Sequence, residues 1–75
     1  TKYKINYHDG TSLINNVDDI IIDDGVATIT IHLYVDKQID SIDLLSNDEE
    51  TNYQRITSNL NVGSLYTLTQ ECYVD

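Results

Sequence analysis

The sequence contains no proline, phenylalanine, tryptophan or methionine, and only three glycines and one cysteine among its 75 residues. Without proline, every backbone N–H is available for strand pairing. The glycines are isolated at positions 10, 25 and 63, which excludes a glycine-rich phosphate-binding loop. The single cysteine, Cys72, has no disulfide partner in the chain, so we expect it to be a small buried apolar residue in a reducing compartment.

Long hydrophobic runs are also missing. The longest aliphatic run is the three isoleucines at 20–22, far shorter than a signal-peptide core or a membrane span. The seven asparagines include none in an Asn-x-Ser/Thr sequon. We therefore expect a cytoplasmic protein that does not associate with membranes.

Basic residues are scarce as well. The chain contains four Lys and Arg and thirteen Asp and Glu, which gives a net charge of −9. Binding to a nucleic-acid backbone requires basic side chains, so direct nucleic-acid binding is disfavoured. A strongly acidic chain is instead attracted to cationic surfaces. The charge therefore favours a basic protein as the partner.

The length predicts one acidic, β-rich domain over residues 1–75. A chain of this size buries only about 60 to 65% of its unfolded surface, so its stability is modest. Ten Ile, seven Leu and five Val are enough for one small core. With so small a core, a homodimer remains an alternative to a monomer.

The clearest local pattern lies between Asp18 and Asp36. Apolar residues alternate with polar ones from position 26 onward, which predicts a strand with one buried face. The dipeptide Asp24-Gly25 precedes it and suits a two-residue type I′ turn. A hairpin folded at this turn would place Ile22 opposite Ala27, and Ile20 opposite Ile29.

A second hairpin and two further strands are indicated. Residues 3–7 alternate before Asp9-Gly10, where a second two-residue turn would set Ile5 opposite Ile14. Residues 39–45 combine β-branched residues with aspartates, and residues 65–74 alternate again, so both segments are expected to be strands.

Residues 46–63 allow two interpretations. Ser46 and Glu49 have the spacing of a helix capping box, which would begin a short helix near residues 47–60. Several Asn, Ser and Thr residues in the same stretch are poor helix formers, which favours an acidic loop followed by an irregular strand. The predicted fold class is therefore mainly β, a small antiparallel sheet of about five strands built from hairpins, with α+β as the alternative.

Catalytic and metal-binding patterns are weak. The aspartate pairs at 18–19 and 23–24 do not follow the Asp-x-Asp-x-Asp-Gly order of a calcium loop. His8, His32 and Cys72 match no zinc spacing, and no serine lies in a Gly-x-Ser-x-Gly elbow. We therefore expect no metal, no cofactor and no enzymatic activity.

The acidic residues and the six tyrosines are the candidates for binding a partner. Carboxylates along strands and turns can form an extended negative surface that steers a basic partner, while tyrosines supply rigid contact area. Tyr34 is expected on a polar sheet face, unless residues 46–63 cover that face. The predicted partner-binding residues are Asp18, Asp19, Asp23, Asp24, Asp36, Asp40, Asp43, Asp48, Glu49, Glu50, Tyr34 and Tyr53.

Two segments give the chain a family resemblance: residues 5–11 (INYHDGT) and residues 22–26 (IDDGV). In this mixture of Tyr, Asn and Asp in short hairpins, the chain resembles small acidic phage- or prophage-encoded inhibitors of the anti-CRISPR and anti-restriction type. The resemblance implies a non-enzymatic protein in the host cytoplasm that blocks the nucleic-acid site of a basic partner, such as a nuclease, by mimicking nucleic acid. The alternative is a structural or assembly module, such as a phage component or small homo-oligomer, in which the acids only maintain solubility.

Overall fold

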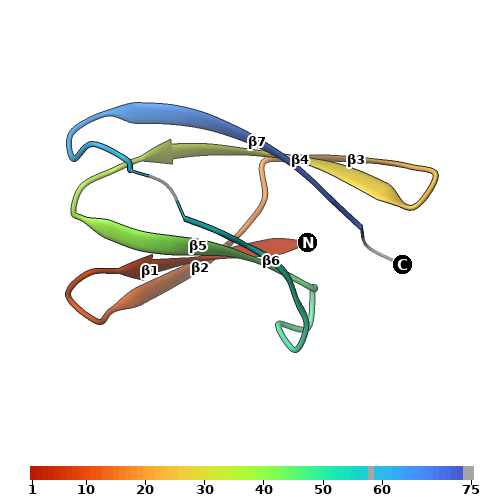
Figure 1. The fold of residues 1–75 in the computed structure, drawn as a ribbon, viewed down its shortest axis with the longest axis horizontal. Coiled ribbons are helices and arrows are strands. Elements are labelled where there is room, and N and C mark those ends of the chain that lie inside the picture. The colour runs from red at the N-terminus through yellow and green to blue at the C-terminus, as the bar shows by residue number, and fades with distance from the viewer. Residues whose placement is uncertain (58, 74–75) are drawn as a thin grey trace.

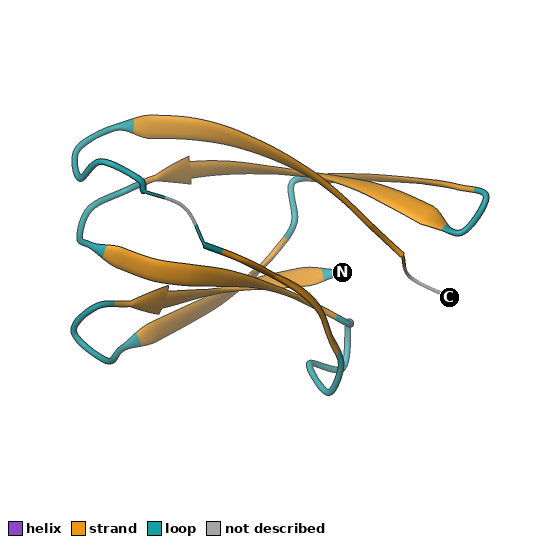
Figure 2. Ribbon diagram, viewed as in Figure 1, coloured by secondary structure: helices purple, strands orange, loops and turns teal. Residues whose placement is uncertain are grey.

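The computed structural model describes residues 1–57 and 59–73. Within these ranges the chain consists of strands joined by loops, with no helix (Figure 2). The prediction of a mainly β fold is therefore confirmed. The strands are β1 (Lys2–Tyr7), β2 (Ser12–Asn16), β3 (Asp19–Asp23), β4 (Val26–Tyr34), β5 (Ile39–Leu45), β6 (Asn52–Ile56) and β7 (Leu65–Tyr73).

The strands form two antiparallel sheets. The four-stranded sheet has the order β2-β1-β5-β6, and the three-stranded sheet has the order β3-β4-β7. Figure 1 shows them as two layers, with β4 in one layer and β5 in the other. The chain crosses between the sheets after β2, after β4 and after β6, so each sheet is built from segments distant in sequence.

The core lies between the layers. Alternate residues of a strand point to opposite faces, so every second residue of the central strands faces the other sheet. On β4 these are Ala27, Ile29, Ile31 and Leu33, and all four are buried. The other members of the buried cluster are Tyr3, Ile5, Val35, Ile39, Ile42, Leu44 and Cys72. The expectation that Cys72 is buried is thereby confirmed.

The β3–β4 hairpin has the predicted register. Ile22 lies opposite Ala27, and Ile20 lies opposite Ile29. The two turn residues, Asp24 and Gly25, have φ values of 53° and 76°. Positive φ at both central positions is the requirement of a type I′ turn, whose twist matches that of the strands it joins.

The predicted register of the β1–β2 hairpin is wrong by one residue, because Ile5 lies opposite Leu13 rather than Ile14. The turn contains three residues, of which Gly10 alone has a positive φ, at 90°. The Asp9 carboxylate accepts hydrogen bonds from the backbone N–H of Thr11, at 2.9 Å, and from its hydroxyl, at 2.6 Å. These bonds fix an Asx turn that holds the longer loop.

The segment from 46 to 63 contains the strand β6, so the alternative of a helix near residues 47–60 is wrong. Residues 46–51 form a turn in which the Ser46 hydroxyl accepts a hydrogen bond from the Thr51 N–H, at 3.1 Å. Glu49 in this turn has a φ of 65°, which no α-helix allows. Tyr53 and Ile56 of β6 then pack against the core.

The remaining strand predictions are confirmed at 39–45 and at 65–73, while Val74 lies outside the described residues. Among the described residues there is no helix of the length and apolarity that a membrane crossing requires.

Candidate partner-binding surface

The basic residues are distributed unequally between the two sheets. Lys2 and Lys4 belong to β1, Arg55 belongs to β6, and Lys37 lies in the β4–β5 loop. The strands of the three-stranded sheet contain no Lys or Arg within their described bounds. This sheet therefore has no cation of its own to balance its carboxylates.

Two of the basic residues pair with carboxylates at the molecular surface. Lys2 Nζ lies 3.1 Å from Glu49 Oε2, and Lys37 Nζ lies 3.0 Å from Asp9 Oδ2. The Lys37 ammonium also lies 4.4 Å from the centre of the Tyr7 ring. Exposed pairs of this kind contribute little to stability. They do, however, neutralise part of the negative charge near the four-stranded sheet.

The third pair is partly buried. The Asp43 side chain, on β5, is only 6% exposed and accepts hydrogen bonds from Arg55 Nε and Nη2, at 2.8 and 3.2 Å. Asn6 Nδ2 donates to the same carboxylate at 2.9 Å. These donors, Arg55 foremost, lower the pKa of Asp43 to about 2, although burial opposes the shift. Asp43 is therefore bound within the four-stranded sheet rather than presented to a partner.

The acidic turn at residues 48–50 lies at the end of the four-stranded sheet. The Ser46 hydroxyl and the backbone N–H of Glu50 donate hydrogen bonds to Asp48 and lower its pKa. Glu49 is paired with Lys2. Two of the three predicted acids here thus have partners within the molecule.

Asp36 and Asp40 lie at the opposite end of the two sheets, beside the β1–β2 turn. His8 Nδ1 lies 3.0 Å from Asp40 Oδ1. Burial, followed by the negative charge of Asp36, raises the pKa of Tyr7. Apart from Asp43, the predicted carboxylates therefore occupy three separate regions, and the structure does not bring all of them together.

The third region is β3, which carries aspartates at both ends. The Asp18 carboxylate accepts a hydrogen bond from the backbone N–H of His32 on β4, so this residue extends the β3–β4 pairing. Asp24 forms part of the hairpin turn. Asp19 and Asp23 lie on the outer face of the sheet, on either side of Ile21, which is 61% exposed.

We use the name acidic face for the outward side chains of the three-stranded sheet. Its centre is a threonine ladder, in which Thr30 lies opposite Thr69, and Thr28 lies opposite Glu71. Large exposed residues surround the ladder, as Tyr34 is 56% exposed and both Leu65 and Tyr73 are 80% exposed. The acidic face comprises Asp19, Ile21, Asp23, Val26, Thr28, Thr30, His32, Tyr34, Leu65, Thr67, Thr69, Glu71 and Tyr73.

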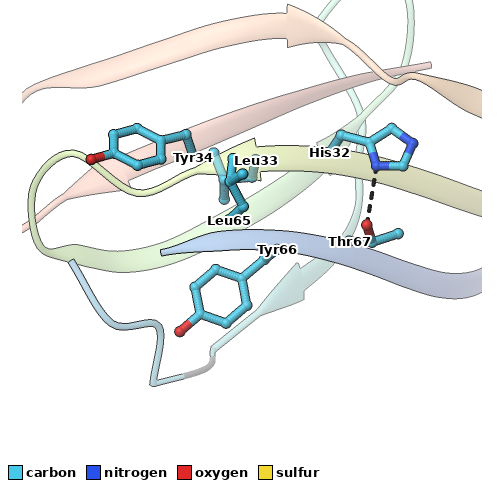
Figure 3. A pocket seen from close by; sticks show the side chains of 6 residues that line it. All are labelled: His32, Leu33, Tyr34, Leu65, Tyr66 and Thr67. Carbon is cyan, nitrogen blue, oxygen red and sulfur yellow. Dashed lines mark hydrogen bonds between the residues drawn. The ribbon is translucent and has the colours of Figure 1, made fainter. Parts of the chain in front are cut away.

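A shallow hollow of about 350 Å³ lies at one end of the acidic face, and its lining comes from residues 32–34 of β4 and 65–67 of β7. Figure 3 shows the Leu65 side chain between the Tyr34 ring and a polar pair at the other end of the hollow. That pair is His32 Nδ1 and Thr67 Oγ1, 3.1 Å apart. The lining offers apolar contact and hydrogen bonds, which suits a side chain of a partner.

The two predicted tyrosines have different environments. Tyr34 lies uncovered on the acidic face, so the described residues of the 46–63 segment do not shield it. Tyr53, on β6, is half-buried and packs against the core. The prediction omitted Ile21, Leu65 and Tyr73, although large apolar residues at outward positions of alternating strands are a signal in the sequence.

The residues considered for metal binding or nucleophilic chemistry lie apart. His8 is in the β1–β2 turn, His32 is on the acidic face, and Cys72 is buried in the core, where burial raises the pKa of its thiol. Within residues 1–57 and 59–73, no group of three or more His, Cys, Asp or Glu side chains is arranged to hold a metal ion.

Comparison of the chain with protein-family models, with curated proteins and with solved structures gave no match.

Proposed function

We propose that this chain is a non-enzymatic binding protein whose acidic face occupies a basic surface of a partner protein. The observation that carries the proposal is the absence of Lys and Arg from the described strands of the three-stranded sheet, combined with its exposed isoleucine, leucine and tyrosines. A surface that combines carboxylates with exposed aromatic and aliphatic side chains has the composition of a protein-binding site.

Binding would have two stages. The uncompensated carboxylates Asp19, Asp23 and Glu71 accelerate the approach of a cationic surface, an effect that salt weakens. Tyr34, Leu65 and Tyr73 then lose their contact with water. Large aromatic and aliphatic side chains of this kind supply most of the binding energy at protein interfaces.

The partner class that we propose is a nucleic-acid-binding enzyme, such as a nuclease. Proteins that bind nucleic acid present clustered Lys and Arg to the phosphate backbone. The acidic face would compete with nucleic acid for that cluster. This proposal predicts that free DNA displaces the chain from its partner.

The test is affinity capture from a lysate of the cells that make the protein, with two variants of equal charge. Asp19→Asn, Asp23→Asn and Glu71→Gln neutralise the acidic face, whereas Asp36→Asn, Asp40→Asn and Glu50→Gln neutralise exposed acids elsewhere. We expect the first triple variant to lose the captured protein and the second to retain it. Capture by the wild type should also fall with salt and with added DNA.

Equal capture by both triple variants, or capture that neither salt nor DNA reduces, would contradict the proposal. In that case a structural or assembly role becomes the better interpretation. The exposed apolar residues Leu13 and Ile14 on β2 and Ile22 on β3 favour such a role, because unpaired strands with apolar side chains promote self-association. Sedimentation of the wild type at low and high concentration separates the two interpretations.

A further inference from the structure

The strand β3 has an open edge. The order β3-β4-β7 gives it a neighbour on one side, and among the described strands it contacts β4 alone. The side chains at this edge are large and exposed, as Ile21 and Ile22 are 61% and 62% accessible to solvent. An open edge with apolar side chains can accept an additional strand.

The hairpin geometry identifies which backbone groups face outward. Asp23 and Val26 flank the two-residue turn and are opposite each other, so they form the hydrogen-bonded pair that closes a type I′ hairpin. Hydrogen-bonded and non-hydrogen-bonded pairs alternate along an antiparallel ladder. Ile20 and Ile22 therefore direct their N–H and C=O groups toward the open edge, where an added strand would bind them.

The aspartates at both ends of β3 determine which strand can be added. A second copy paired antiparallel about Ile21 would place Asp19 of one chain opposite Asp23 of the other, twice in the dimer. Like charges that are directly opposite destabilise a strand pair, whereas opposite charges stabilise it. The edge therefore disfavours self-pairing and favours a strand with basic residues at the matching positions.

We infer that β3 binds an extended segment of the partner protein, in which two basic residues four positions apart flank three residues of high β-propensity. In antiparallel pairing, the basic side chains lie opposite Asp19 and Asp23, and the backbone of the segment bonds to Ile20 and Ile22. The inference rests on the proposed function, because it specifies the partner element that meets Asp19 and Asp23 of the acidic face.

The other open edge strands lack this arrangement. The edge strand β2 contains no charged residue, and the edge strand β6 carries Arg55, which is bound to Asp43. The strand β7 carries one acid, Glu71, near one end. Among the described edge strands, β3 alone has a carboxylate at each end of an apolar centre.

A synthetic peptide tests the inference directly. The probe is Thr-Lys-Val-Thr-Val-Lys-Thr with blocked termini, and the matched controls are the same peptide with Glu in place of Lys and a permuted peptide with adjacent lysines. Two-dimensional NMR of the isotope-labelled protein gives the affinity and the location together. We expect the probe to bind at least about tenfold more tightly than the Glu peptide, since two cross-strand charge pairs change sign.

The location is the decisive readout. Bound probe should slow amide hydrogen exchange at Ile20 and Ile22, which face the open edge, and leave Ile21 unchanged because its amide already bonds to β4. Ile22→Pro removes one outward N–H and should abolish binding of the probe. Ile22→Thr, which keeps the N–H, should bind it. If Ile22→Pro fails to fold, the exchange data on the wild type still decide.

Three results would overturn the inference: no binding of the probe, equal binding of the permuted peptide, or perturbations confined to the threonine ladder. The last result would leave the proposed function intact, since a basic ligand would still occupy the acidic face. Failure of the charge-variant capture experiment, in contrast, would remove the proposed function itself. The two failures are therefore distinguishable.

Discussion

The charged side chains of the two sheets have different environments. In the four-stranded sheet, Asp43 and Arg55 bind each other across neighbouring strands, and the Lys2 ammonium pairs with Glu49 in the adjoining turn. In the three-stranded sheet, Asp19 and Asp23 face solvent on either side of an exposed isoleucine. Both sheets contain acids, but only the first contains basic residues within its described strands.

This contrast shows that the position of the few cations is more informative than the number of anions. A net charge of −9 describes the whole chain and selects no surface. The location of the four basic residues removes the four-stranded sheet from consideration and leaves the acidic face as the candidate. Substitutions of the paired carboxylates and of the exposed ones should therefore have different effects.

The largest effect is expected at the bound carboxylate of the four-stranded sheet. Asp43→Ala should lower the free energy of unfolding by about 3 kcal/mol, because it removes the buried carboxylate that accepts hydrogen bonds from Asn6 and Arg55. Asp19→Ala, on the acidic face, should change it by less than about 0.5 kcal/mol. Urea unfolding of both variants measures the difference. Similar losses for both would contradict the division of roles.

The pH dependence of stability should reveal the titration of the same carboxylate, Asp43. The folded-state pKa of Asp43 is about 2, below its ordinary value of 3.8, so its stabilisation is present above pH 4 and is lost as the pH falls toward 2. The loss amounts to about 2 kcal/mol. The stability difference between the wild type and Asp43→Asn should therefore shrink over this range. A stability difference between the two proteins that is constant from pH 5 to pH 2 would show that the pKa of Asp43 is not lowered by folding.

A smaller effect on stability is expected in the β3–β4 turn of the three-stranded sheet. Asp24 has a φ of 53°, which Asn tolerates and Ala does not. Asp24→Ala should therefore destabilise the protein by about 1 kcal/mol, whereas Asp24→Asn should stay within about 0.5 kcal/mol of the wild type. Thermal unfolding of the two variants provides the comparison, and equal losses would argue against the type I′ turn.

The smallest effect concerns self-association. Asp19→Asn combined with Asp23→Asn removes two like-charge contacts from an antiparallel β3–β3 pair, so the dimerisation constant should rise about fivefold. Sedimentation equilibrium measures this constant. Asp48→Asn with Glu50→Gln makes an equal change of charge in the other sheet's turn and serves as the control. An equal rise in the control would mean that net charge, rather than the β3 edge, limits association.

The sequence predicted the positions of the strands more accurately than the register in which they pair. At β3–β4, turn chemistry and alternation agree on one register, and that register is observed. At β1–β2, an Asp-Gly dipeptide fits a two-residue turn and also the last two positions of a three-residue turn. Which of the two turns forms depends on distant contacts, such as that of Asp9 with Lys37, which lies 28 positions away.

The candidate site was predictable only in part for the same reason. Exposed aspartates at the ends of β3 follow from local pattern, and Tyr34 falls on the polar face by alternation. The burial of Asp43 does not follow from the local sequence pattern. It depends on Asn6, 37 positions away, and on Arg55 on the neighbouring strand. The pairing of distant strands decides which carboxylates are structural.

Hydrogen–deuterium exchange of the chain in complex with a captured partner shows which sheet the partner covers. We expect slower exchange in β3, β4 and β7 on binding, with the amides of β2 and β6 unchanged. A reduction confined to the four-stranded sheet would contradict this expectation, because the partner would then be bound where the cations lie.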